Sequence, residues 1–595
     1  MTASRPTGAD GVAGTQGNRG KLRRPDRLGL AAVALGFLWW IPVRLLGEAV
    51  RDVAIIWAAW PETPWRGAAV LVLAGGGGIY LALRLATTRA GKVGAAAVWV
   101  VLTPVAIRLL LTGSTGGFLG LGPPRYGAWL IAGAALAPVA LAAWCWGRRV
   151  VLPATILYGV AMGAGSVFLL HRGAISIGDL GLYRQALWST LHGYGFMHVS
   201  GEGGSHFAVH NSPALLALLP LYWLWPAGEL LLLLQTAAVA ACLPLAYRVL
   251  APHAGERMAV VGAAGFCLLS GVVAPALDKF HEVSFALPLM LGAVLALREG
   301  RGRRFGVCVA GLLLLRETFA PMAVVLGVGS WLGGRRRWGA YAAAAGVGWL
   351  LLSYLVVMPA FTTPTTRVPY EQLYGHLGRT PSAMVRAVVR RPGVILGQLG
   401  KPANQLWAEE VGSPVGGPLG LVAWPGWLGA GEALTVAGSR TGTTWPVRNC
   451  FCQYAATIHA GMWLGLVAVL AAGRRRWGWS SRVLTVALLA SFLVAAGQTL
   501  PWVGKTVRAI PPEQVRARAA VLALLPPAAP VAVPYDMLPL VSERPTVFYN
   551  AGDQPATQYL VSLAGQDYQR PQPGRYRELG RYGPYTLWKA AGGAR

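Results

Sequence analysis

Long apolar runs recur along the chain and are separated by short polar or basic segments. A helix of about 20 apolar residues crosses ~30 Å of hydrocarbon, so each run of that length predicts a membrane span. The pattern predicts an all-α polytopic transmembrane helical bundle of about 11–13 membrane segments, counting shorter apolar stretches. The full-length spans are expected at Leu28–Leu46, Gly67–Leu83, Val93–Leu111, Ala128–Trp146, Val151–Leu170, Leu230–Tyr247, Met258–Ala276, Val283–Leu297, Trp338–Met358, Tyr454–Ala472 and Val483–Val503.

Three further apolar stretches do not fit a simple crossing. Phe305–Leu332 has basic residues at both ends and Arg316-Glu317 in its middle, which predicts two short helices forming a V from the cytoplasmic side. Ser212–Trp225 is short and rich in aromatic residues, so we expect a helix along the outer surface. Pro418–Val436 is interpreted as re-entrant or interfacial, because a full crossing would move the later arginines to the wrong side.

The large positive charge of the chain does not alter the prediction of a membrane protein. Of 595 residues, 54% are hydrophobic and 13% are charged, and the formal net charge is +29. The Lys and Arg residues lie mainly in short clusters between apolar spans, where the positive-inside rule expects cytoplasmic loops. We therefore interpret the charge as membrane topology and expect no nucleic-acid partner. The topology predicts a multi-pass protein of the cytoplasmic membrane with a cytoplasmic N-terminus.

The spans divide the chain into four parts. Residues 1–27 are expected to be a disordered basic cytoplasmic tail, and residues 28–150 to form four N-terminal transmembrane helices. Residues 151–503 form the transmembrane core, with outer loops at 171–229 and 361–453. Residues 504–595 contain one helical pattern and several short apolar runs between Gly and Pro, which predict a small extracytoplasmic α/β domain.

Ionisable and polar residues gather at the predicted outer surface of the core. Such groups are costly near a bilayer, so they are candidates for a functional site. Those assigned to this face, or reaching it from the V, are Asp179, Arg184, Gln185, His206, His210, Asp278, Lys279, His281, Glu282, Arg316 and Glu317.

Each candidate also has a simpler interpretation. Asp179 is placed to cap the helix predicted at Leu182–Leu191. The spacing of His206 and His210 is typical of metal ligands on a helix, but nearby glycines fit a solvated interfacial pair equally well. The segment from Asp278 to Glu282 suits acid/base work, metal binding or a polar membrane boundary. Arg316-Glu317 suits a lipid-linked phosphate or a structural ion pair.

Together these motifs resemble a family of predicted prokaryotic membrane proteins catalogued as domain of unknown function 2079. The likeness runs from about Val151 to the C-terminus, and departs from the family in the extra N-terminal spans and in the split between His206-Phe and His210-Asn-Ser-Pro. The segments that carry it are Asp179-Leu-Gly-Leu-Tyr-Arg-Gln185-Ala-Leu-Trp188, Leu191-His192-Gly193, His206-Phe207, His210-Asn-Ser-Pro213, Asp278-Lys-Phe-His281-Glu282, Arg316-Glu317 and Gln453-Tyr454.

That family is in turn similar to GT-C type glycosyltransferases, which implies a GT-C-like core and a sugar transfer at the outer face. The resemblance implies a polyprenyl-phosphate-linked sugar donor and a cell-envelope glycan, lipid or protein acceptor. It makes Asp179 and Asp278 catalytic, with Asp179 as general base, and the other candidates substrate-binding. No cofactor is required, and a divalent metal at Asp179, Asp278 and His281 is left open. The alternatives are a transporter of lipid-linked saccharide or another solute, and a non-catalytic membrane assembly protein.

Overall fold

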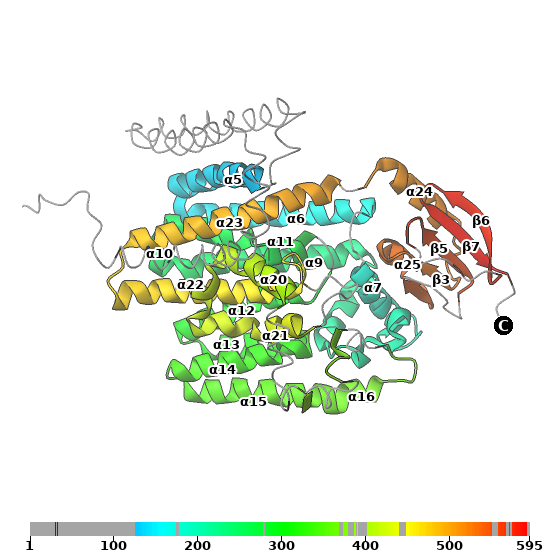
Figure 1. Cartoon of the computed structure of the whole chain (residues 1–595). Coiled ribbons are helices and arrows are strands. Elements are labelled where there is room, and N and C mark those ends of the chain that lie inside the picture. The colour runs from blue at the N-terminus through cyan, green and yellow to red at the C-terminus, as the bar shows by residue number, and fades with distance from the viewer. Residues whose placement is uncertain are drawn as a thin grey trace, which may run out of the picture.

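The computed structural model describes residues 125–591 apart from 174–177, 278–279, 368–372, 379–385, 388–389, 391–400, 440–447, 509, 550–556, 567–570 and 572–573, and also Asp26, Leu30 and Val33. The predicted tail at 1–27 and the first three predicted spans therefore lie outside the described residues, except for those three positions. The rest of the chain forms a helical bundle with a small sheet-containing domain at one end (Figure 1).

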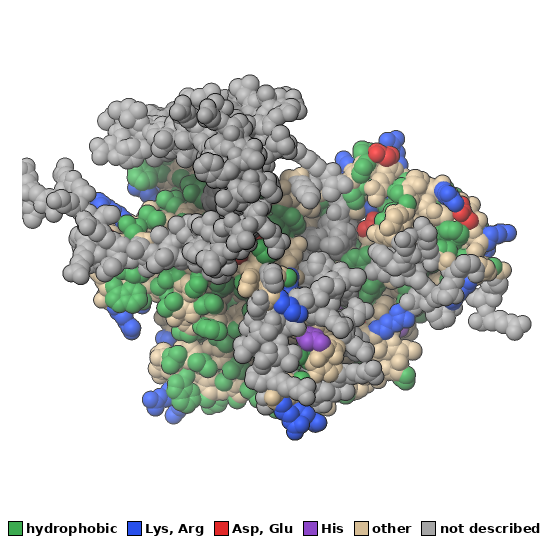
Figure 2. All heavy atoms as spheres, viewed as in Figure 1, with side chains coloured by type: hydrophobic (Ala, Val, Ile, Leu, Met, Phe, Trp, Pro, Cys, Tyr) green, Lys and Arg blue, Asp and Glu red, His purple; other side chains and the backbone are tan. Residues whose placement is uncertain are grey.

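The bundle confirms the predicted polytopic helical fold. Within the described residues, five helical segments are long and apolar enough to cross a membrane: Ala132–Arg172, Gly228–Cys267, Arg336–Phe361, Tyr454–Arg476 and Ser481–Gly504. Hydrophobic side chains cover much of the flank of the bundle, while Lys and Arg side chains lie toward its ends (Figure 2). The helices are α5 (Arg125–Trp146), α6 (Val151–Arg172), α9 (Gly228–Ala240), α10 (Cys242–Cys267), α11 (Ser270–Leu277), α12 (Val283–Glu299), α13 (Gly302–Leu315), α14 (Ala320–Leu332), α15 (Arg336–Leu352), α16 (Met358–Phe361), α22 (Tyr454–Arg476) and α23 (Ser481–Arg508).

The basic clusters meet at one end of this bundle. Arg148 lies 3.9 Å from Glu256, and Arg248 donates to Glu299 at 2.5 Å. Arg474 donates to the backbone carbonyl of His253 in the same region. Gly255 allows the chain to reverse within α10 because its φ of 73° is favourable only for glycine. The spans thus alternate in direction as the positions of the arginines predict.

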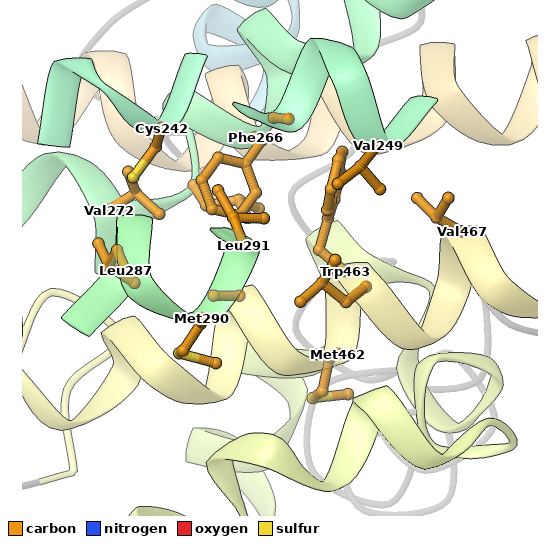
Figure 3. Close-up of a cluster of buried hydrophobic side chains, with 14 of the residues drawn as sticks. Cys242, Val249, Phe266, Val272, Leu287, Met290, Leu291, Met462, Trp463 and Val467 are labelled. Atoms are coloured by element: carbon orange, nitrogen blue, oxygen red, sulfur yellow. The ribbon is translucent and has the colours of Figure 1, made fainter. Parts of the chain in front are cut away.

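Helix α22 is the centre of the apolar core. Trp463 on this helix is fully buried and lies edge-to-face against Phe266 of α10, with ring centroids 4.9 Å apart (Figure 3). The apolar stretch Pro418–Val436 packs along the same helix as short pieces: η8 (Gly417–Leu421), η9 (Trp424–Gly429) and α21 (Ala430–Gly438). A Cβ on Gly465 would lie only 1.9 Å from the Gly420 carbonyl oxygen. This stretch therefore does not cross as one helix.

Two other irregular stretches also agree with their predictions. The segment Phe305–Leu332 forms two helices, α13 and α14, which meet where Arg316 adopts an extended conformation and η5 (Glu317–Phe319) begins. The stretch after Ser212 forms η4 (Pro213–Leu218) and α8 (Leu219–Leu224), and exposes Trp223 and Leu224 as an interfacial helix would.

The C-terminal domain consists of α24 (Pro512–Ala523), α25 (Leu538–Val541) and a five-stranded sheet in the order β4-β3-β5-β7-β6. The strands are β3 (Val531–Val533), β4 (Val547–Tyr549), β5 (Tyr559–Leu563), β6 (Tyr576–Tyr582) and β7 (Tyr585–Ala590). The predicted α/β character is confirmed. The sequence pattern did not predict β6. This strand lies at the edge of the sheet and is rich in charged residues, so it shows no alternation of apolar and polar positions.

Helices α14 and α15 pack closely enough to require glycine. A Cβ on Gly339 would lie 2.6 Å from the Gly327 carbonyl oxygen, whereas one on Gly348, on the same helix, would meet nothing within 4 Å. We expect Gly339→Ala to cost about 1–3 kcal/mol because backbone must move, and to lower the melting temperature in detergent. Gly348→Ala should leave the melting temperature unchanged or raise it slightly. Equal melting temperatures for the two variants would contradict the packing.

Candidate functional site

Helix α7 (Gly178–Leu191) lies between the end of the bundle and the C-terminal domain, at the end away from the basic clusters (Figure 1). Its inward side chains, including Leu180, Tyr183 and Leu187, are buried against the core helices. The helix begins at Gly178, so Asp179 is inside the first turn and does not cap a helix at Leu182. The side chain of Asp179 instead contacts residues from two other parts of the chain.

The first contact of Asp179 is with His281. Asp179 Oδ2 and His281 Nε2 are 2.9 Å apart, and the His281 side chain is 7% exposed. The backbone N–H of His281 donates to Gln235 Oε1 of α9 at 3.0 Å, which fixes the turn between α11 and α12. Tyr535 of the C-terminal domain is the second partner, because its hydroxyl donates to Asp179 Oδ1.

A buried cation lies deeper along the same array. Arg316 donates to Glu282 Oε1 at 3.2 Å and to His210 Nε2 at 2.7 Å. His210 Nδ1 lies 2.9 Å from Glu317 Oε1, and the other oxygen of Glu317 accepts from the Asn211 backbone at 2.9 Å. The Tyr183 hydroxyl donates to Glu282, which follows His281 directly. The array therefore runs from Asp179 to Glu317 through adjacent ionisable groups.

Burial and charge set the protonation of the two loop histidines. Burial and the neighbouring Arg316 guanidinium lower the pKa of His210. A neutral His210 accepts from Arg316 at Nε2 and donates from Nδ1 to Glu317, so both ring nitrogens are used. Burial alone would lower the pKa of His206, but the Glu202 carboxylate, 3.0 Å from Nδ1, raises it overall.

Small parts of the array reach its surface. The side chains of Asp179, His210 and Arg316 are 15%, 13% and 11% exposed, whereas those of Glu282 and Glu317 are 2% and 0% exposed. A general base must meet its substrate, and Asp179 is the partly exposed carboxylate of this array. Arg316 is a cation held in place by Glu282 and His210.

Two predicted binding residues lie outside this array. Arg184 donates to Glu543 Oε1 at 2.5 Å and to the Tyr222 hydroxyl at 3.2 Å. Gln185 is buried and donates to Ser200 at 2.9 Å and to the Arg544 carbonyl at 3.2 Å. Both residues therefore join α7 to the C-terminal domain. Successive positions on a helix point in different directions, so Arg184 and Gln185 meet other neighbours than Tyr183 does.

Asp278 and Lys279 lie outside the described residues, so the predicted carboxylate pair of Asp179 and Asp278 stays a prediction. Across the described ranges, no group of three or more His, Cys, Asp or Glu residues is arranged to hold a metal ion. His206 pairs with Glu202, and His210 pairs with Arg316 and Glu317, so neither histidine needs a metal to explain its placement.

The structure adds three residues that sequence reasoning missed. Tyr183 is four positions after Asp179, a spacing that places both on one face of α7 and that could have identified it. Glu202 is four positions before His206, but the two lie in separate 3-10 turns, so no helical pattern marked their pairing. Tyr535 is 356 positions from Asp179, and no local pattern marks it.

Comparison with known proteins gives a family match and a distant similarity to a solved structure. The family described as "Predicted membrane protein (DUF2079)" matches residues 178–574. Among solved structures, the chain is similar to ArnT from Cupriavidus metallidurans, crystallised with undecaprenyl phosphate, at 13% identity and a TM-score of 0.44. That match covers 73% of this chain and 97% of the other. A search of curated proteins found no match.

The buried cation should be essential for stability. Arg316→Met leaves the buried Glu282 carboxylate and His210 without the guanidinium, which should cost about 3–5 kcal/mol. We expect a large fall in melting temperature in detergent. Arg303→Met, which removes an exposed arginine of the basic end, is the control and should change little. An Arg316→Met protein as stable as the control would rule out the role assigned to this cation.

Proposed function

The chain belongs to this family of predicted membrane proteins, and we propose that it is a polyprenyl-phosphate-sugar-dependent glycosyltransferase. It would act at the outer face of the cytoplasmic membrane, in the synthesis of cell-surface glycans. The observation that carries the proposal is the accessible Asp179 carboxylate, oriented by His281 and Tyr535 and joined through Glu282 to the buried Arg316.

In this proposal Asp179 is the general base. It takes the proton of an acceptor hydroxyl while the acceptor oxygen forms a bond to the anomeric carbon of the donor sugar. The bond between that carbon and the phosphate oxygen breaks at the same centre, and polyprenyl phosphate leaves with the electron pair. The phosphate ester supplies the driving force, so the scheme needs no nucleotide cofactor, and a divalent ion at Asp179, Asp278 and His281 is left open.

The leaving phosphate needs cationic and hydrogen-bonding partners. Arg316 Nε and His206 Nε2 are buried and have no hydrogen-bond partner among the described residues. Both residues pack on His210, with Arg316 2.7 Å from its Nε2 and the His206 and His210 ring centroids 5.7 Å apart. We assign the phosphate to this side of the array and not to Arg184, which is already paired with Glu543. Lys279, which lies outside the described residues, stays the additional cation that the sequence predicts for the phosphate.

The acceptor and the sugar would contact the residues nearest the base. His281 and Glu282 are adjacent in sequence, and His281 Nδ1 lies 3.8 Å from Glu282 Oε2. Both lie at the turn before α12, where His281 contacts the Asp179 carboxylate. Asp278, three positions before His281, is the second proposed catalytic acid.

The test is transfer by the purified full chain in lipid nanodiscs. A panel of radiolabelled polyprenyl-phosphate sugars would be supplied with a membrane-glycan extract as acceptor. Asp179→Asn should lower turnover roughly 100-fold or more, because it removes the base without changing shape, while donor binding remains. Glu578→Gln removes an exposed carboxylate of the C-terminal domain and should retain full turnover.

An Asp179→Asn protein that transfers sugar at the wild-type rate would overturn the proposal. If that protein instead moved labelled donor across the bilayer of sealed vesicles, and Arg316→Lys abolished the movement, a transporter would be the better description.

A further inference from the structure

The Asp179 carboxylate is completed by a residue from a different domain. Tyr535 belongs to η10 (Tyr535–Met537), the turn that follows β3, and its hydroxyl donates to Asp179 Oδ1. His281 contacts the other oxygen, Oδ2, at 2.9 Å. The two contacts fix the plane of the carboxylate. A carboxylate offers about four acceptor sites, so these two hydrogen bonds do not by themselves exhaust its capacity to accept a proton.

The C-terminal domain approaches the backbone of α7 closely at two glycines. A Cβ on Gly178 would lie 2.1 Å from the Tyr535 ring. A Cβ on Gly181 would lie 2.6 Å from Leu538 Cγ and 2.9 Å from the Leu538 carbonyl carbon. Both glycines are buried and helical, where alanine would be the better helix former. The close approach of the domain explains their presence.

Polar contacts hold the same interface in register. Arg184, whose side chain is 13% exposed, donates to Glu543 Oε1 at 2.5 Å, and Tyr222 donates to the same oxygen at 2.8 Å. Gln185 and Ser200 donate to the carbonyls of Arg544 and Pro545 at 3.2 and 3.3 Å. A loosely tethered domain would not need an ion pair whose arginine is largely buried, together with several carbonyl contacts.

From these observations we propose that the C-terminal domain is part of the active site, with Tyr535 as a positioning residue for Asp179. The site is then complete only when this domain is docked on α7. This inference rests on the proposed function, in which Asp179 is the base. It also gives Arg184 a docking role, in place of the substrate-binding role that its position in the sequence predicts.

The first experiment removes the Tyr535 hydroxyl and keeps its ring. In the nanodisc transfer assay, Tyr535→Phe should lower kcat roughly 10- to 100-fold because the base is no longer held in place, and the donor KM should stay within about 2-fold. Adding Tyr535→Phe to Asp179→Asn should cause no further loss, since the hydroxyl acts only through Asp179. Tyr582→Phe removes a hydroxyl from β6, at the far edge of the same sheet, and should leave kcat unchanged.

The second experiment separates docking from substrate binding at Arg184. Arg184→Glu places two carboxylates together and should abolish transfer, as Glu543→Arg should with two cations. The double variant Arg184→Glu/Glu543→Arg restores an ion pair of opposite polarity and should recover a substantial part of the activity. A donor-binding arginine would not be rescued in this way, so failure of the double variant to recover would contradict the docking role.

The outcomes distinguish the two proposals. If Asp179→Asn is inactive but Tyr535→Phe keeps the wild-type kcat, the positioning role is wrong and the proposed transferase stands. If Asp179→Asn remains fully active, both are wrong. If Tyr535→Phe lowers kcat at constant donor KM and the charge swap restores transfer, the C-terminal domain is established as part of the site.

Discussion

The burial of one arginine is the constraint on which this end of the molecule depends. A guanidinium removed from water is costly unless carboxylates and hydrogen bonds surround it. Arg316 meets this requirement with Glu282 from the turn before α12 and with His210 from the loop before η4, while Glu317 pairs with the same histidine. Three stretches far apart in the sequence are thereby held together where the helices α13 and α14 meet.

The same arrangement explains why the helix is broken at Arg316. An uninterrupted helix through this segment would turn successive side chains to different sides. The extended conformation of Arg316, with φ of −169° and ψ of 145°, lets both Arg316 and Glu317 face His210. Backbone groups released by such a break are tolerated at membrane depth only where protein surrounds them. The helix break at Arg316 is therefore tolerated because the residues of the array surround it.

The two ends of the bundle use charge in different ways. At the basic end, arginines from successive loops pair with exposed glutamates such as Glu256 and Glu299, and such pairs contribute little to stability. At the other end Arg316, Glu282 and Glu317 are buried, and each is matched to a neighbour. Their array ends at the Asp179 carboxylate, which is partly exposed and is held by His281 and Tyr535. The chemistry that we propose follows from this asymmetry.

Within the described residues, the sequence by itself determined the long apolar helices, the break at Arg316-Glu317, the short helical stretch before Trp225 and the α/β character of the C-terminal domain. These features depend on local composition and periodicity, which a single chain displays directly. It also identified Asp179, His281, Glu282 and Arg316 as candidates, because ionisable residues stand out against apolar spans.

Only the tertiary structure decided what those residues contact. It placed Arg184 and Gln185 against the C-terminal domain, brought Tyr535 onto Asp179, and paired a charged edge strand, β6, with β7. Each of these contacts joins segments whose approach depends on how whole elements pack, and a residue carries no local mark of a partner several hundred positions away. The periodicity of apolar residues therefore predicted the helices and strands. The packing of these elements against one another decided which of their side chains form the site.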